Sequence, residues 1–185
     1  MSKERTGADR LTLVRGDITE QRVDAVVNAA NSSLLGGAGV DGAIHARGGP
    51  RILEACREIR RARYPGGLPT GGAVLTEAGE LPARFVIHTV GPVWRGGGER
   101  EDELLADAYR NTLRVAADEG LRTVAFPSIS TGAYGYPTAS AALVALATIR
   151  GQLGATRGSF TEVRFVLFSD RDLEIYRSAL EELTG

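Results

Sequence analysis

The chain has 185 residues, of which 43% are hydrophobic and 24% are charged. This length is enough for one hydrophobic core, so we expect a single domain over residues 1–185. The 22 Lys and Arg and 23 Asp and Glu residues leave a net charge of −1, which excludes the broad basic surface of a general nucleic-acid-binding protein. The single cysteine, Cys56, excludes an intrachain disulfide, and with only two histidines we expect no zinc site.

The N-terminal segment is polar and has no apolar signal region. No apolar run in the sequence approaches the ~20 residues that span a bilayer. We therefore expect a cytoplasmic protein that does not bind membranes, with residues 1–9 forming a flexible extension. The densest basic run, between Arg57 and Arg63, is typical of a solvated helix end and does not by itself indicate nucleic-acid binding.

Apolar segments bounded by turn residues predict six strands, at residues 11–16, 24–30, 71–79, 84–91, 123–129 and 162–169. The segments between and after them predict helices at residues 40–61, 101–119 and 137–153 and at the C-terminus. Gly48, Gly49 and Pro50 divide the first helical segment into two pieces. Ser169 and Asp172 have the spacing of a capping box at the start of the last helix.

The alternation of strands and helices determines the expected fold class. Strands joined by helical crossovers are predicted to run parallel. The strands at 84–91 and 162–169 are apolar on nearly both faces, as expected where helices cover both sides of a sheet. We therefore predict a three-layer α/β/α domain of the α/β class. Ligands bind such sheets beyond the carboxyl ends of the strands, so the segments after the strands form the candidate site.

Two glycine-bearing segments follow predicted strands and precede predicted helices. GAGVDG at 37–42 matches G-x-G-x-x-G by letter, but it does not come directly off its strand, and the acidic residue of a dinucleotide fingerprint is missing. SISTGAYGYP at 128–137 offers amides and hydroxyls for an anion, although an ordinary strand–helix connection has the same composition. No GxxxxGK motif is present. Together the two loops predict a diphosphate held without a metal or a lysine.

Four polar side chains near these loops are candidates for ligand contact, and each has a structural alternative. Asp17 follows the first strand, where it could accept from a purine amino group or cap a turn. Asn28 and Asn31 can donate and accept, which suits sugar hydroxyls, but asparagine after a strand is also a common turn residue. Asp41 precedes GAIHA and would be a good helix N-cap, or an ionised acceptor that positions water or a ribose hydroxyl.

The two histidines and one tyrosine complete the list of candidates. His45 lies one helical turn after Asp41, on the same face. His88 lies inside an apolar strand, where we expect a satisfied core histidine. Tyr134 could stack on a sugar or base, or pack in the core. No Ser-His-Asp or Cys-His set is apparent in the loops, so catalysis at this site would rest on placing a water rather than on a strong nucleophile.

These motifs resemble those of the macrodomains, and within that family those of the MacroD-type ADP-ribose hydrolases. The resemblance runs from GDIT at 16–19 through VNAANSSLLGGAGVDGAIH, GGAVLTEAG, VIHTVGP and PSISTGAYGYP to VLFSDRD, so it covers almost the whole chain. It implies one macrodomain with a central mixed, mostly parallel sheet, and no cofactor. The implied activity is removal of mono-ADP-ribose from acidic side chains of proteins and deacetylation of O-acetyl-ADP-ribose.

The resemblance also implies roles for particular residues. Asn31 and Asp41 match the catalytic Asn and Asp of the family. Asp17 and Ile18 would bind the adenine end, with Phe168 stacking on the base. The remaining ligand-binding residues, which contain no metal ligand set, would be Asn28, Gly37, Gly39, Val40, Ser130, Thr131, Gly132, Ala133 and Tyr134. Ala38 departs from the usual all-glycine loop, and it would cost ~1 kcal/mol if its position needed a positive φ.

Two other functions remain open from the sequence. One is a reader module that binds ADP-ribosylated partners without cleaving them, and the other is a phosphatase acting on ADP-ribose 1″-phosphate. The presence of both Asn31 and Asp41 favours the hydrolase, because a reader needs only the pocket. The expected partners are ADP-ribose, mono-ADP-ribosylated proteins and O-acetyl-ADP-ribose, with nucleic acid expected only as ADP-ribosylated ends. No motif indicates an oligomeric state.

Overall fold

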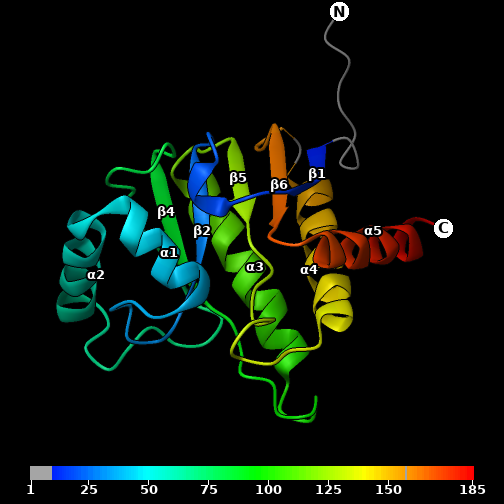
Figure 1. Cartoon of the computed structure of the whole chain (residues 1–185), viewed down its shortest axis with the longest axis horizontal. Coiled ribbons are helices and arrows are strands. Elements are labelled where there is room, and N and C mark those ends of the chain that lie inside the picture. Colours follow the sequence, from blue (N-terminus) through cyan, green and yellow to red (C-terminus); the bar gives the residue numbers. More distant parts are fainter. Residues whose placement is uncertain (1–9, 157) are drawn as a thin grey trace, which may run out of the picture.

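The computed structural model describes residues 10–156 and 158–185, so the expected extension at 1–9 lies outside the described residues. The strands of this part of the chain are β1 (Leu11–Arg15), β2 (Ala25–Ala30), β3 (Ala73–Glu77), β4 (Phe85–Val90), β5 (Thr123–Phe126) and β6 (Glu162–Leu167). Its helices are the 3-10 turn η2 (Ile18–Glu20) and α1 (Gly39–Gly48), α2 (Pro50–Ala62), α3 (Glu101–Asp118), α4 (Thr138–Ala155) and α5 (Asp170–Thr184) (Figure 1).

The six strands form one sheet in the order β1-β6-β5-β2-β4-β3. Every neighbouring pair is parallel except β3 and β4, which are antiparallel, so the predicted mixed, mostly parallel sheet is confirmed. In the parallel pair of β2 and β4, Asn28 lies directly opposite His88. Their side chains therefore leave the sheet on the same face, a placement that the sequence does not reveal because the two residues are far apart in the chain.

Helices cover both faces of the sheet, as the sequence predicts (Figure 1). On one face, Val27 and Ile87 pack with buried side chains of α3, α4 and α5. On the other, Val26 and Val86 pack with buried side chains of α1 and α2. Neighbouring residues of a strand point to opposite faces, so the two cores alternate along β2 and β4. The domain is therefore a three-layer α/β/α fold.

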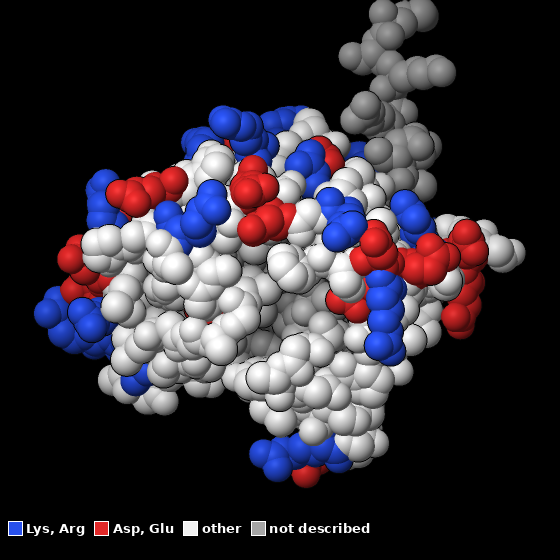
Figure 2. All heavy atoms as spheres, viewed as in Figure 1, with Lys and Arg blue, Asp and Glu red and all other residues white. Residues whose placement is uncertain are grey.

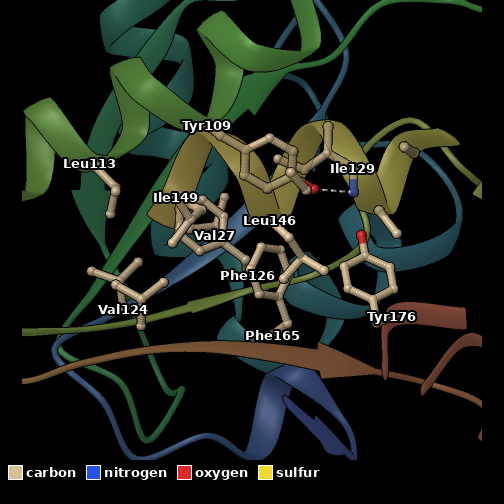
Figure 3. Packing of buried hydrophobic residues seen from close by; sticks show 14 of the residues in the cluster. Val27, Tyr109, Leu113, Val124, Phe126, Ile129, Leu146, Ile149, Phe165 and Tyr176 are labelled. Carbon is tan, nitrogen blue, oxygen red and sulfur yellow. Dashed lines mark hydrogen bonds between the residues drawn. The ribbon is translucent and has the colours of Figure 1, made fainter. Parts of the chain in front are cut away.

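A cluster of aromatic side chains in the larger core fixes the segment that follows β5 (Figure 3). The Tyr109 hydroxyl accepts a hydrogen bond from the Ile129 amide at 3.1 Å. The Tyr176 hydroxyl donates to Ser128 Oγ at 2.9 Å. Burial raises the pKa of Tyr176 to about 12, so its phenol keeps the proton that it donates. The loop after β5 thus begins on two rigid anchors in the core.

Several element boundaries differ from the predicted ones for local reasons. The strand expected at 123–129 ends at Phe126, because Pro127 has no N–H to donate to a ladder. The capping prediction for the last helix is confirmed, since Ser169 Oγ accepts from the Asp172 amide at 3.1 Å. In the described part of the chain, none of the helices combines the length and apolar character that a bilayer span needs.

Candidate functional site

A pocket of about 310 Å³ lies beyond the carboxyl ends of β2, β4 and β5. It is lined by residues of four segments, namely 29–31, 37–41, Gly91 and 128–134. Figure 2 shows a hollow near the centre of the face that these loops form, surrounded mostly by uncharged residues, with charged side chains farther out. The position agrees with the rule that ligands bind α/β sheets at this edge, from which the segments after the strands are predicted to form the site.

One wall of the pocket is the glycine loop and the first turn of α1. Gly36 and Gly39 have φ angles of +92° and +61°, which L-residues with side chains rarely adopt. Within the helix, the Gly42 amide donates to Ala38 O at 3.3 Å. The preceding amides, at 39–41, have no intrahelical acceptor, and all three residues line the pocket. The positive end of the helix dipole therefore faces the pocket and would attract an anion.

The opposite wall is the loop at 128–137, which curls around its own backbone. The Tyr136 amide donates to Ser130 O and the Gly135 amide to Gly132 O, each at 3.0 Å. Ser130 has a φ of +69°, an uncommon conformation for a residue other than glycine. Among the described residues, no acceptor is paired with the amides at 132–134, which line the pocket. Residues with unpaired amides thus line both walls of the pocket.

The start of α1 differs from the prediction for Asp41 and shows that Ala38 fits the loop without strain. Asp41 is not the N-cap of this helix, because the helix begins at Gly39 and Ala38 occupies the N-cap position without a side-chain hydrogen bond. Asp41 therefore lies in the first turn, where its carboxylate still benefits from the helix dipole. Ala38 has a φ of −99°, so alanine fits this position without the backbone strain that a positive φ would cause.

The Asn31 side chain stabilises the loop after β2 through hydrogen bonds and has one further N–H group available. Its Oδ1 accepts from the amide and the hydroxyl of Ser33, and its Nδ2 donates to Gly36 O at 3.0 Å. A side-chain amide has two N–H groups, so one remains for another acceptor. A Cβ added to Gly37 would lie 3.3 Å from Asn31 Nδ2 and 3.0 Å from Asp41 Oδ2. Asn31 and Asp41 therefore flank one spot on the pocket wall.

Asp41 is 5% exposed, and the two oxygens of its carboxylate differ in their surroundings. Oδ1 accepts from Asn28 Nδ2 at 2.7 Å. His45 Nε2 lies 3.3 Å from the same oxygen, close enough for an ion pair when protonated but without hydrogen-bond geometry. Oδ2 has no partner among the described residues and lies beside Gly37 at the pocket wall. The carboxylate thus offers one oriented acceptor to whatever occupies the pocket.

Asn28 has a different position from the one predicted for a ligand-binding residue. Its side chain is fully buried and is not part of the pocket lining, so it supports Asp41 from behind and does not face a ligand. The buried position follows from the strand, because Asn28 points toward α1 between Val26 and Ala30, which belong to the smaller core. The predicted loop residues Gly37, Gly39 and Val40, in contrast, do line the pocket.

Of the residues that the structure describes, no lysine or arginine lines the pocket, so an anion there would be held by backbone amides and the α1 dipole. Ser130, Gly132, Ala133 and Tyr134 line it as predicted, whereas Thr131 does not, and its hydroxyl donates to Ser128 O at 3.0 Å. Over the described ranges, no group of three or more His, Cys, Asp and Glu side chains has the arrangement that could hold a metal ion.

Comparison with known proteins places this geometry in a family. The Macro domain family model matches residues 27–145. The chain belongs to the macrodomain family. It is 51% identical to an O-acetyl-ADP-ribose deacetylase of Escherichia fergusonii, with 94% of this chain and 96% of that protein covered. Its structure is similar to an Oceanobacillus iheyensis macrodomain with ADP, at 48% identity, a TM-score of 0.89 and coverage of 93% and 90% of the two chains. It is also similar to a Trypanosoma brucei macrodomain in complex with ADP-ribose, at 39% identity, a TM-score of 0.83 and coverage of 96% and 70%.

In this macrodomain the residues predicted for the adenine end lie on the same edge of the sheet but outside the pocket lining. Asp17 follows β1, and its Oδ1 accepts from the amide and the hydroxyl of Thr19 at 2.8 and 2.7 Å, so its capping role is confirmed. Ile18 is buried. Phe168 follows β6 and is 81% exposed, which is unusual for an aromatic ring and leaves a face free for stacking.

Three residues that shape the macrodomain pocket were not identified from the sequence as supports of the site. A Cβ at Gly42 would lie 2.7 Å from Gly37 O, and a Cβ at Gly91 would collide with Ser130 Oγ, so both glycines permit close approach of the loops. Arg60 donates to Tyr64 O at 2.8 Å and Ser33 O at 2.9 Å, which ties the end of α2 to the Asn31 loop. The sequence could have indicated the two glycines only through their positions, because Gly91 directly follows a strand and Gly42 lies near the start of a helix.

Proposed function

We propose that this macrodomain is a hydrolase that binds ADP-ribose, removes mono-ADP-ribose from acidic side chains of proteins and deacetylates O-acetyl-ADP-ribose. The observation that carries the proposal is the asymmetry of Asp41. One carboxylate oxygen is bonded to Asn28, and the other faces a pocket walled by unpaired amides. The named relatives support the ligand class, since one is an O-acetyl-ADP-ribose deacetylase and a similar structure contains ADP-ribose.

The diphosphate of the ligand would lie between the two walls of amides. The α1 N-terminus supplies the donors at 39–41, and the loop after β5 supplies those at 132–134. Preorganised backbone donors of this kind bind an oxyanion without a metal or a cationic side chain. The distal ribose and its ester would then reach the end of the pocket where Asn31 and Asp41 flank Gly37.

The reaction consumes one water and divides the ester into a carboxylic acid and the free ribose hydroxyl. Asp41 Oδ2 would accept a hydrogen bond from this water or from a ribose hydroxyl, and the spare N–H of Asn31 would donate to the sugar. A phosphate oxygen of the bound ligand would help to take the proton from the water. Catalysis would then come from placement in a preorganised site and from charge already present in the substrate.

The test is a product analysis with three substrates offered separately to the wild-type protein in the presence of EDTA. These are O-acetyl-ADP-ribose, a protein carrying glutamate-linked mono-ADP-ribose, and ADP-ribose 1″-phosphate. We expect release of ADP-ribose from the first two. Tight binding of ADP-ribose without release from any substrate would replace the proposal by the reader function, and release of phosphate from the third alone would replace it by the phosphatase function.

A further inference from the structure

The buried polar groups behind Asp41 form a chain of hydrogen bonds that continues away from the pocket. Asn28 Nδ2 donates to Asp41 Oδ1 at 2.7 Å and lies 3.1 Å from His88 Nδ1. His88 Nε2 lies 2.9 Å from Thr76 Oγ1, which donates to Glu77 O at 2.9 Å. Asn28 and His88 are fully buried, and Thr76 is 4% exposed. Polar side chains in this surrounding need partners, because an unpaired one costs free energy.

The direction of each hydrogen bond in this chain follows from chemistry. A carboxylate only accepts, so the amide nitrogen of Asn28 and not its oxygen must face Asp41. The second N–H of that nitrogen points to His88 Nδ1, which must therefore be the unprotonated ring nitrogen. The ring proton then lies on Nε2 and is donated to Thr76 Oγ1. Burial, with a smaller effect of His45, lowers the pKa of His88 to about 3, so the ring stays neutral.

We infer that His88 is a positioning residue for Asp41, acting through Asn28, in the hydrolysis proposed above. Neutral His88, protonated at Nε2, takes one N–H of Asn28 and so fixes the rotation of that amide. The other N–H then fixes Asp41 Oδ1, and the geometry of the carboxylate leaves Oδ2 at the pocket wall. Without this support the Asn28 amide would retain an unpaired buried N–H and could rotate away from Asp41.

A purely structural histidine would fill space in the smaller core without affecting the reaction. The two roles differ in which substitution restores function. Phenylalanine at position 88 keeps a planar ring but removes the acceptor for Asn28. Asparagine at the same position is smaller, yet its Oδ1 occupies the place of the histidine Nδ1 and can accept from Asn28. A positioning role predicts that asparagine functions better, whereas a space-filling role predicts that phenylalanine functions better.

The experiment compares His88→Phe and His88→Asn with Thr89→Val as a matched control. Thr89 is also fully buried on β4, but it points to the opposite face and bonds to Gly72 O at 2.8 Å. For each variant, kcat and KM are measured with O-acetyl-ADP-ribose, and the affinity for ADP-ribose is measured by calorimetry. The protonation of the His88 ring nitrogens is read from ¹⁵N NMR of the wild type, which requires no turnover.

We expect His88→Phe to lower kcat by at least about tenfold while KM and ADP-ribose affinity stay within about twofold, because the acceptor acts on the placement of Asp41 and not on ligand binding. His88→Asn should recover most of the rate, and Thr89→Val should stay within about twofold of the wild type. In the double variant with Asp41→Asn, His88→Phe should add less than about a further twofold, because both changes act on one group.

Three results would overturn the inference. These are a wild-type rate in His88→Phe, an equal rate loss in Thr89→Val, or an NMR signature with the proton on Nδ1. If His88→Phe does not fold, His88→Leu removes the acceptor for Asn28 in the same way, and a wild-type rate in that variant would also contradict the inference. If the wild type itself shows no turnover, the proposed function fails, and the NMR measurement still decides whether the hydrogen-bonded chain exists as described.

Discussion

Two aspartates lie at opposite ends of strand β2 and have contrasting surroundings. Asp24, before the strand, has both carboxylate oxygens occupied, since Oδ1 accepts from Arg84 at 3.1 Å and Oδ2 from the amides of Arg122 and Thr123 at 2.8 and 3.1 Å. Asp41, beyond the other end, has Oδ1 occupied and Oδ2 open to the pocket. The fold thus saturates the carboxylate that connects strands and leaves one oxygen of the pocket carboxylate without a partner among the described residues.

The pKa of Asp24 reflects the hydrogen bonds that its carboxylate accepts. Burial of this group raises its pKa, but the hydrogen bonds from Arg122, Thr123 and Arg84 outweigh that effect and the net pKa is lowered. A lowered pKa means that the ionised form is stabilised by folding. The amides that satisfy Asp24 have their counterpart at the pocket edge in the unpaired amides of 39–41 and 132–134, which are available to an anion from outside.

The largest effect is expected from placing a charge between the two amide walls. Gly132 has open space around its Cα and lines the pocket, so Gly132→Glu can fold while directing a carboxylate toward the region proposed for the diphosphate. Repulsion and bulk should weaken ADP-ribose binding by at least about 100-fold, or ~2.7 kcal/mol. Calorimetry measures the change. Gly154→Glu, in open space near the end of α4, is the control, and an equal loss there would remove this loop from the site.

A smaller effect, on stability, is expected at the saturated end of the strand. Asp24→Asn removes the charge and sets an N–H₂ group against donors that the carboxylate now satisfies. The free energy of unfolding should fall by about 1.5–3 kcal/mol, the range for hydrogen bonds to a charged group. Urea unfolding at neutral pH measures it. The ADP-ribose affinity of the folded protein should not change. A loss of affinity without a loss of stability would contradict the purely structural role of Asp24.

As the pH falls, the contribution of neutral His88 to the free energy of unfolding should be lost at a higher pH than the contribution of ionised Asp24. The folded-state pKa of His88, about 3, is below its ordinary value of 6.5, so the unfolded chain binds a proton that the folded chain excludes. Its contribution to stability is present above pH 6.5 and is lost as the pH falls, by at most about 1.4 kcal/mol per pH unit. The contribution of Asp24 is lost only at lower pH, near and below its ordinary value of 3.8.

The measurement is urea unfolding of the wild type and His88→Asn at pH 7 and pH 5. The neighbouring groups Asp41, His45 and Cys56 are present in both proteins, so the difference between the two pH dependences isolates His88. We expect the wild type to lose more stability than the variant on acidification. Parallel pH dependences would show that the ring is not held neutral in the folded protein.

The smallest effect is expected from replacing Ala38 with glycine. Ala38 has a negative φ, so glycine relieves no strain there, whereas Gly36 and Gly39 do have positive φ angles. Glycine is a better N-cap than alanine but loses more backbone freedom on folding, and these effects oppose each other. Ala38→Gly should therefore change the free energy of unfolding by less than about 0.5 kcal/mol and leave ADP-ribose affinity unaffected. A large gain in either quantity would show that alanine strains the loop.

The sequence predicts features of this molecule that depend on local pattern. The strand–helix alternation gave the three layers, and the rule for α/β sheets selected the loops at 31–41 and 128–137 that line the pocket. The two-piece helix is also confirmed, because Gly49 has a φ of +77° and Pro50 begins α2. His88 proved to be a partnered core histidine, as expected for a polar residue in an apolar strand.

The features that the sequence did not predict depend on distant pairing or on missing side chains. Asn28 was expected to contact a ligand, but its opposition to His88 is set by the register of β2 and β4, which no local pattern records. Asp41 was expected to cap α1, but the helix begins at Gly39 after an alanine that offers no capping signal. The roles proposed for Asp17, Ile18 and Phe168 at the adenine end stay predictions.

The proposed role of the open Asp41 oxygen in hydrolysis is tested by the turnover of Asp41→Asn. Asparagine keeps the size of the side chain, and its Oδ1 can still accept from Asn28. The measurement is the rate of ADP-ribose release from a protein carrying glutamate-linked mono-ADP-ribose, at saturating substrate, with Asp24→Asn measured beside it. We predict that Asp41→Asn slows release by at least about tenfold, or ~1.4 kcal/mol, while Asp24→Asn keeps the wild-type rate. Full activity in Asp41→Asn would contradict the account.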